Sequence, residues 1–202
     1  MSDLMTPVLL SLLGFCVTMY ITPGPNNVMV AASAANYGIP ATMPHMLGIA
    51  FGFALMFDIV SAGLGSLLLV WPPLVPAMRW IGAAWMAWLA WKIANAGPPQ
   101  PGQRKRLLGF VGAAGFQWIN PKAWLIALAA ATTFLRPDQP LGPQLLRFSV
   151  IFLICGMPCL LVWAMIGSGA GRLLHSPARF RTFNIIMALL LLASVVPVLI
   201  EG

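Results

Sequence analysis

Two charged residues lie deep inside long apolar stretches of this sequence, and they are the first candidates for chemistry. Asp58 is near the middle of the apolar segment Met46–Val70, and Lys122 is near the middle of Leu107–Leu135. If these segments cross a membrane, a charge at the bilayer centre costs about 2.5–3.5 kcal/mol. Each charge should therefore line a wet cavity or have a partner. Two interpretations stay open: a functional site that uses both residues, or a structural ion pair between them.

Polar residues also gather at two proline-containing motifs, each of which interrupts an apolar segment. The motifs are Thr22-Pro23-Gly24-Pro25-Asn26-Asn27 and Gln117-Trp118-Ile119-Asn120-Pro121-Lys122. Proline has no backbone N–H and disfavours a helix at the residue before it, so both segments should break there. At the first break, freed carbonyls and the Asn26 side chain can accept hydrogen bonds from an ammonium. The half-helix that restarts near Asn27 attracts a carboxylate, so the motif suits a zwitterion.

We expect the two motifs to face each other around one polar cavity at mid-depth. The candidate substrate-binding residues are Pro23, Gly24, Pro25, Asn26, Asn27, Gln117, Asn120 and Lys122. On a helix, Asp58 shares a face with Ser61 and Gly65, and it is the candidate for ion coupling. The two histidines, His45 and His175, are too few and too distant to predict a metal site, and no cofactor is expected.

The composition excludes a soluble or disordered protein. Of 202 residues, 60% are hydrophobic and 7% are charged, with a mean hydropathy of +0.89, whereas soluble domains carry about 25% charged residues. The net charge of +7 could suggest nucleic acid, but the basic residues lie between apolar runs, as in membrane proteins. We therefore expect one transmembrane domain, 1–202, with membrane lipids and no nucleic acid as partners. A homo-oligomer is compatible with the sequence.

Six apolar segments predict six transmembrane helices, of which spans 1 and 4 are broken. They are Leu4–Ala35, Met46–Val70, Leu74–Ala96, Leu107–Leu135, Leu145–Ile166 and Phe183–Ile200. The first has no basic residue before it and is not expected to be a signal peptide. Glycine pairs at Gly48/Gly52 and Gly167/Gly171 predict close helix contacts.

Basic residues predict the orientation. One side has Lys92, Arg104, Lys105, Arg106, Arg172, Arg179 and Arg181, and the other has only Arg79, Arg136 and Arg147. The positive-inside rule puts the richer side in the cytoplasm, and the C-terminus is then periplasmic. A re-entrant first segment would move the N-terminus, so the C-terminus is the firmer of the two placements.

The two broken segments occupy equivalent places in two halves, about 1–98 and 105–202. Because each half has three spans, the halves must have opposite orientations in the membrane. The sequence thus predicts an all-α membrane protein built from two inverted three-helix repeats. Paired interruptions by glycine and proline in inverted halves indicate a transporter binding site. The alternative is that both breaks are simple kinks, since proline is common in membrane helices.

Several motifs resemble those of the LysE/RhtB amino-acid exporters, over nearly the whole chain. They are Thr22-Pro23-Gly24-Pro25-Asn26-Asn27, the glycines of Gly48-Ile49-Ala50-Phe51-Gly52 with Gly63-Leu64, and Phe116-Gln117-Trp118-Ile119-Asn120-Pro121-Lys122. The segments 82–94 and 184–191 are most similar to the cysteine/O-acetylserine exporter branch. The resemblance implies a multi-pass protein of the bacterial inner membrane that exports small amino acids or their derivatives, driven by proton exchange.

Two other classes of function stay open, although the sequence favours them less. A membrane-embedded redox enzyme or thiol carrier needs paired cysteines at a break, whereas Cys16, Cys155 and Cys159 form no such motif and should be buried structural residues. A cation exporter needs several intramembrane acidic or histidine ligands, and only Asp58 is available. We expect a transporter rather than an enzyme, with a neutral substrate: if Asp58 pairs with Lys122, no counter-charge is left for a lysine or arginine side chain.

Overall fold

Helices make up every regular element in the part of the chain that the structure, a computed structural model, describes: residues 2–65, 70, 73–96, 108–173, 176–194 and 196. They are α1 (Ser2–Ile21), α2 (Pro25–Tyr37), α3 (Ile39–Ile59), the π-helical turn η1 (Val60–Leu64), α5 (Leu74–Ala94), α6 (Phe110–Phe116), the 3-10 turn η2 (Gln117–Ile119), α7 (Pro121–Phe134), α8 (Leu141–Leu173) and α9 (Pro177–Ala193). The all-α prediction is confirmed. Arg104, Lys105, Arg106, His175, Ile200 and the side chain of Arg172 lie outside the described residues.

Both predicted helix breaks are present. The first lies between Ile21 and Pro25, where α1 and α2 meet at a bend of 56°. The second consists of η2 and Asn120, whose backbone is extended with φ −87° and ψ 106°. One detail of the prediction is wrong: α2 restarts at Pro25 and not near Asn27. Proline is favoured at the first helical position because its φ is already helical and its missing N–H would have no acceptor there.

Two described helices are long and apolar enough to cross a membrane without interruption, over Ile39–Gly63 and Leu141–Gly171. The bent pair α1 and α2 provides a third such crossing if it counts as one span. Helix α8 has 33 residues and is longer than the predicted Leu145–Ile166. It extends through a glycine-rich stretch, whose glycines let it pack closely on α2, to reach a length of about 50 Å.

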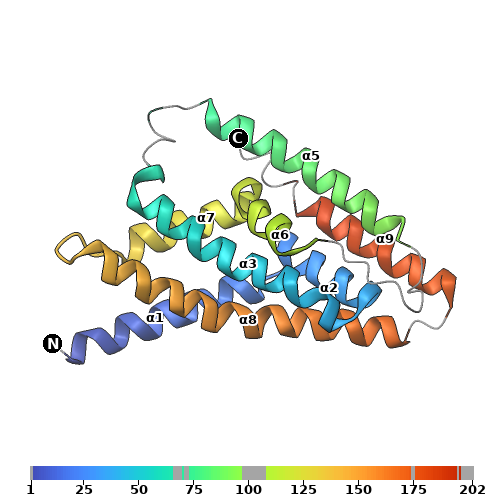
Figure 1. Cartoon of the computed structure of the whole chain (residues 1–202), viewed down its shortest axis with the longest axis horizontal. Helices are drawn as coiled ribbons and strands as arrows, with labels where there is room; N and C mark the ends of the chain where they lie inside the picture. Colours follow the sequence, from blue (N-terminus) through green and yellow to red (C-terminus); the bar gives the residue numbers. More distant parts are fainter. Residues whose placement is uncertain are drawn as a thin grey trace.

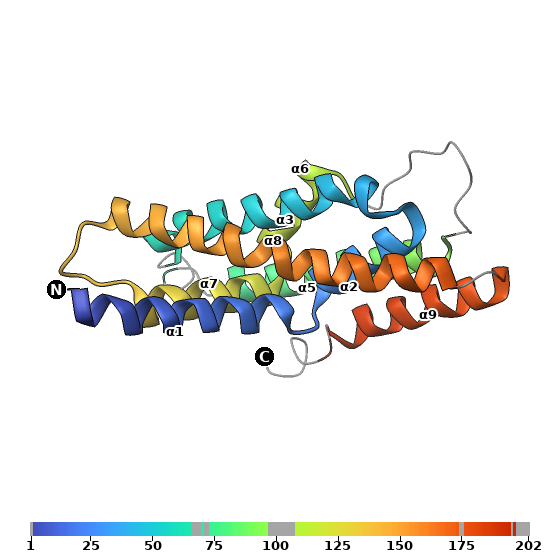
Figure 2. The same cartoon turned by 90° about the horizontal axis from the view of Figure 1, so that it is seen from below.

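When α1 with α2 and α6 with α7 are each counted as one broken helix, consecutive helices run in alternating directions along the long axis of the molecule (Figure 1). From the N-terminus, α1 and α2 lead to the opposite end, and α3 returns beside them (Figure 1). Helix α8 runs the full length of the bundle, while α5 and α9 lie side by side along one flank (Figures 1 and 2). The two broken helices thus lie within one bundle, and each break is near the middle of its length.

Helix α2, which follows the first break, forms the centre of the bundle. Pro25 and all residues from Asn27 to Asn36 are buried. Its main neighbour is α8, where a Cβ on Gly167 would collide with the carbonyl oxygen of Ala31. A second close contact joins α3 and α6, where a Cβ on Gly52 would come within 2.5 Å of the Ala114 backbone. The glycine pairs predicted to pack helices closely therefore do so.

The outer surface of the bundle is apolar. Val111, Leu146 and Leu125 are 81%, 68% and 64% exposed, and Trp80 and Trp91 are also exposed. Soluble proteins rarely expose apolar surface on this scale. The arrangement is the one expected of a helix bundle whose outer side chains contact lipid tails.

The close packing of α2 against α8 gives a direct test. Gly167→Ala should lower the thermal unfolding temperature of the detergent-purified protein, because the new methyl group meets the backbone of Ala31. Overpacking of this kind costs about 1–3 kcal/mol. The matched control is Gly169→Ala on the same helix, where a Cβ has nothing within 4 Å. Equal unfolding temperatures for the two variants would contradict the described α2–α8 contact.

Candidate functional site

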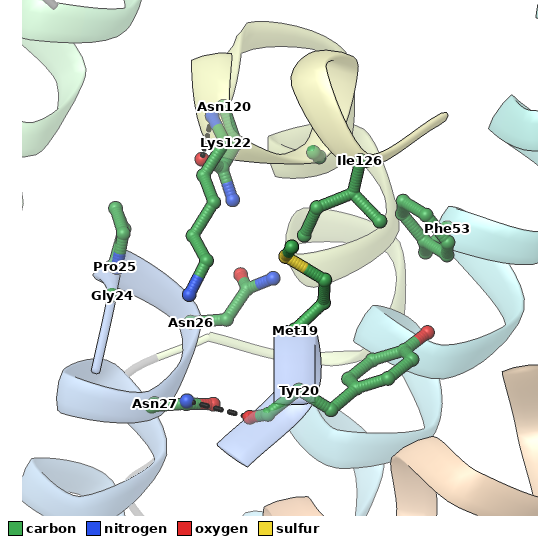
Figure 3. Close-up of a pocket in the computed structure, with 11 residues that line it drawn as sticks. Met19, Tyr20, Gly24, Pro25, Asn26, Asn27, Phe53, Asn120, Lys122 and Ile126 are labelled. Atoms are coloured by element: carbon green, nitrogen blue, oxygen red, sulfur yellow. Dashed lines mark hydrogen bonds between the residues drawn. The ribbon is translucent and has the colours of Figure 1, made fainter. Parts of the chain in front are cut away.

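A small cavity lies where the two helix breaks meet. Its lining residues come from α1, the first break, α2, α3, the second break and α7: Met19, Tyr20, Gly24, Pro25, Asn26, Asn27, Phe53, Asn120, Lys122, Ala123 and Ile126 (Figure 3). The cavity holds about 30 Å³ of space that water can reach, enough for about two water molecules. An amino acid is larger, so it can bind here only if lining side chains move.

An amide pair joins the two breaks directly. Asn26 Nδ2 donates to Gln117 Oε1 at 2.9 Å, and Gln117 Nε2 donates back to Asn26 Oδ1 at 3.2 Å. Gln117 is fully buried, and its Nε2 also donates to the carbonyl of Ala113 at 2.9 Å. It lies behind Asn26 and does not line the cavity. Gln117 therefore positions Asn26, whereas Asn26 itself lines the cavity.

The Asn27 side chain provides hydrogen bonds for carbonyls at the end of α1. A helix that stops leaves its last carbonyls without intrahelical partners, and the prolines at positions 23 and 25 cannot supply an N–H. The Asn27 Nδ2 group donates to the carbonyls of Tyr20 at 2.7 Å and Thr22 at 2.8 Å. Trp163 of α8 donates its indole N–H to the carbonyl of Ile21 at 3.1 Å. Asn27 therefore has a structural task in addition to lining the cavity.

Lys122 reaches across from α7 to the same break. Its Nζ donates to the carbonyl of Thr22 at 2.8 Å and to that of Pro23 at 3.3 Å, and its side chain extends past Gly24 (Figure 3). A lysine in the first turn of α7 opposes the helix dipole, whereas the C-terminal end of α1 attracts a cation. The ammonium therefore binds at the end of α1.

Asn120 and Pro121 begin α7. The Asn120 side chain is buried and accepts a hydrogen bond from the backbone N–H of Lys122 at 3.2 Å, which makes it the N-cap of this helix. Pro121 occupies the first helical position, where proline is favoured. The first turn of α7, including Lys122, is thereby fixed beside the cavity.

The structure places Asp58 away from the cavity lining. Both of its carboxylate oxygens accept from the hydroxyl of Ser149 on α8, at 3.0 Å. Within the described residues neither Asp58 nor Lys122 forms an ion pair, so the two are not salt-bridged to each other. The expected stripe of Asp58 with Ser61 and Gly65 is also wrong, because the helix becomes π-helical at Val60 and Gly63 has a φ of 132°.

Sequence reasoning missed the aromatic wall of the cavity. Tyr20 and Phe53 both line it, with ring centroids 5.9 Å apart in an edge-to-face arrangement. The Tyr20 ring also lies against Gly156 of α8, where a Cβ would come within 2.9 Å of it. Tyr20 lies two residues before the first motif in the sequence, and this proximity is the one signal that could have identified it. Nothing in the local sequence distinguishes Phe53 from other buried phenylalanines.

The three cysteines are free and buried, Cys16 on α1 and Cys155 and Cys159 on α8. This confirms the prediction that they are buried. None of them lines the cavity. Among the described residues, the polar groups at the site are therefore the amides of Asn26, Asn27 and Asn120, the hydroxyl of Tyr20, nearby backbone carbonyls and the Lys122 ammonium.

Together these groups can recognise a zwitterion. Backbone carbonyls of Thr22 and Pro23 already bind one ammonium, that of Lys122. The N-terminal end of α2 meets the cavity at Pro25, Asn26 and Asn27, and its N-cap, Gly24, has no side chain to occupy the first N–H groups. Such an end attracts an anion. Acceptors for an ammonium and attraction for a carboxylate thus lie next to each other.

Comparison with known proteins gives a family match over most of the chain. The sequence matches the family described as LysE type translocator over residues 17–202. Proteins named cysteine/O-acetylserine efflux protein from Salmonella typhimurium, Shigella flexneri and Escherichia coli O157:H7 are each 32% identical to it, over 191, 189 and 190 residues. The alignments cover 93% of this chain and 95%, 95% and 96% of these relatives. No solved structure matches the chain.

The repair of α1 by Asn27 can be tested through stability. Asn27→Ala should lower the unfolding temperature, because it removes a buried donor from the carbonyls of Tyr20 and Thr22. An unsatisfied buried group costs about 1–3 kcal/mol. The control is Asn95→Ala, which removes an exposed bond to the carbonyl of Trp91 and should change stability by less than about 0.5 kcal/mol. Similar unfolding temperatures for both variants would contradict this role.

Proposed function

The chain belongs to the LysE type translocator family, and from this premise we propose that it exports a small neutral amino acid or amino-acid derivative from the cytoplasm. The proposed substrates are of the cysteine/O-acetylserine type, with threonine and homoserine next. The observation that carries the proposal is the cavity between the two breaks, which is lined by the N-terminal end of α2 and by Lys122, whose ammonium binds the carbonyls of Thr22 and Pro23. The named function of the relatives supports the same substrate class.

The charge of the cavity favours a neutral substrate. Among the described residues that line it, Lys122 is the one with a charged side chain. A lysine or arginine substrate would bring a second cation next to it without a carboxylate to compensate, and an uncompensated charge in a membrane is costly. This charge balance requires no ion pair between Asp58 and Lys122. A neutral zwitterion adds no net charge to the site.

We further propose six membrane crossings arranged as two inverted repeats within a single domain. The alternating directions of the helices support this, as does the equivalent place of the two breaks at the start of each half. Lys92, Arg179 and Arg181 lie towards the end of the bundle opposite Arg136, which supports the orientation with a periplasmic C-terminus. The membrane is then the bacterial inner membrane.

Asp58 is the proposed carrier of the coupled proton. It is half-buried, it lies on the helix that contributes Phe53 to the cavity, and its carboxylate has a neutral partner, Ser149. A carboxylate with a neutral partner can take up a proton without breaking an ion pair. Movement of α3 against α8 can then expose it to opposite sides of the membrane in turn.

Counterflow in proteoliposomes tests the proposed function. Vesicles loaded with unlabelled cysteine, O-acetylserine, threonine or homoserine should accumulate the same labelled compound, because exchange through one site needs no external energy. Vesicles loaded with unlabelled lysine or arginine should not accumulate the same labelled basic amino acid. Empty vesicles serve as the control. Counterflow with the basic amino acids alone would overturn the proposed substrate class, and no counterflow with any amino acid would overturn transport.

Asp58→Asn should separate substrate exchange from proton coupling. The amide cannot bind and release a proton, so accumulation driven by a pH gradient should be lost while counterflow persists. The matched control is Asp138→Asn, because Asp138 is an exposed residue of the turn between α7 and α8. It should keep both activities. Gradient-driven accumulation that survives in Asp58→Asn would remove Asp58 from the coupling step.

A further inference from the structure

The Lys122 ammonium occupies the carbonyl site that suits a substrate ammonium. We propose that Lys122 is a built-in competitor: it binds the carbonyls of Thr22 and Pro23 until the substrate's ammonium replaces it, and it then binds the substrate's carboxylate. This inference rests on the proposed function, because it concerns the same cavity. It adds an exchange of partners by a residue of the protein, and it explains how one site can require both ends of a zwitterion.

The geometry shows that the carbonyl pair binds a primary ammonium. Lys122 Nζ lies 2.8 Å from the Thr22 oxygen and 3.3 Å from the Pro23 oxygen. The helix stops at Ile21, so no continuing helix supplies N–H groups to these oxygens. The Thr22 oxygen also accepts from Asn27 Nδ2 at 2.8 Å, and a carbonyl oxygen has a second lone pair for the ammonium. An α-ammonium group offers the same three N–H donors as a lysine side chain. The carbonyl pair can therefore bind either of them, one at a time.

Lys122 has no anionic partner of its own in the described part of the chain. Its ammonium binds two neutral carbonyls, and the carboxylate of Asp58 is bound to Ser149 instead. Lys122 is also in the first turn of α7, where the helix dipole disfavours a cation. The bonds from the Lys122 ammonium to the carbonyls are already strengthened by its charge, but a carboxylate adds the Coulomb attraction of an opposite full charge, which a neutral carbonyl lacks. The carboxylate of an incoming zwitterion is thus a better partner for Lys122 than the carbonyls it leaves.

Space points to the same exchange. The cavity is smaller than an amino acid, and the Lys122 side chain lies directly over Gly24. A Cβ built on Gly24 would be 2.9 Å from Lys122 Cδ and 3.1 Å from Nζ. Lys122 and Gly24 both line the cavity, so a movement of this side chain away from Gly24 would enlarge the cavity and uncover the carbonyl pair. Making room for the substrate and freeing its ammonium site are therefore one movement.

Selectivity follows from the exchange. An amine without a carboxylate would displace Lys122 and leave two cations side by side with no anion between them. An acid without an amine would leave the carbonyl pair to Lys122 and gain little space. Only a molecule with both groups replaces Lys122 at the carbonyls and also neutralises it. The wild-type protein should therefore bind cysteine, but neither cysteamine, which lacks the carboxylate, nor 3-mercaptopropionate, which lacks the amine.

The test is ligand-induced thermal stabilisation of the full-length protein in detergent, measured with these three compounds. In Lys122→Met the competitor and its repulsion are removed, while the side chain stays unbranched and becomes only slightly shorter. The variant should bind cysteamine at least about tenfold more tightly than the wild type does, as expected when a close like-charge contact is relieved. It should also lose its preference for cysteine over cysteamine. The matched control is Lys92→Met, since Lys92 lies over the ring of Trp88 on α5 and not at the cavity.

A purely structural role of Lys122 predicts no gain of cysteamine binding. If Lys122→Met does not fold, Lys122→Gln keeps a donor for the two carbonyls without the charge, and the same gain is expected. Folded variants that still reject cysteamine, next to a wild type that binds cysteine, would overturn this proposal and leave the proposed function standing. A wild type that binds none of the three compounds, with a variant that gains cysteamine, would leave the exchange site standing and overturn the cysteine-type substrate.

Discussion

Unpaired backbone groups at the first helix break are the constraint on which this structure depends. In a bilayer, water cannot satisfy a carbonyl that has lost its helical partner, and each such group costs about 2–7 kcal/mol. The break before Pro25 leaves several carbonyls at the end of α1, and the donors for them come from three different helices: Asn27 of α2, Trp163 of α8 and Lys122 of α7. The hydrogen bonds that satisfy the carbonyls of the break therefore also hold these helices together. The cavity is a consequence of this repair, since the donors must converge on one place.

At the second break the backbone groups find their hydrogen-bond partners locally, and this difference suggests different roles for the two breaks. Asn120 caps α7 with its own side chain, and its backbone N–H donates to the carbonyl of Gln117 at 3.3 Å. Gln117 in turn donates to Ala113 of the same segment. The backbone of this break is thus satisfied by local groups and can stay rigid, while the Gln117 side chain also pairs with Asn26. The first break depends on a long, flexible lysine from elsewhere, so it is the one whose hydrogen bonds a ligand can replace.

How far the sequence could predict the site depends on how local each cause is. Both breaks were predictable, because proline and asparagine act on the backbone within a turn of their own position. That Lys122 is important was also predictable, because a charge in an apolar segment needs an explanation wherever its partner is. The hydrogen-bond partners of Lys122 were not predictable, because the carbonyls of Thr22 and Pro23 come near this residue only through packing of α7 on the first break. Ser149 gave no sequence signal as the partner of Asp58, since one serine in an apolar helix is common and its bond depends on the register of α3 against α8.

Polar contacts at both ends of α2 show how a central helix can be held firmly and still exchange partners. Near its start, Asn26 pairs with Gln117, and near its end Asn36 forms a buried amide pair with Asn184 of α9, with N–O distances of 3.0 and 3.3 Å. Between them, Ser33 accepts from Thr42 of α3 at 3.1 Å. A neutral hydrogen bond contributes about 0.5–1.5 kcal/mol net, whereas breaking a buried ion pair by losing one partner costs about 3–5 kcal/mol. Neutral amides thus fix the register of α2 without a barrier as high as charged pairs would impose. The glycine-lined surface of α8 removes the interlocking side chains that would otherwise resist a shift. A helix held by amides and packed on glycine suits a protein whose site must open to both sides. Among the described residues that line the cavity, Lys122 has the one ammonium, and its change of partner can be linked to that motion.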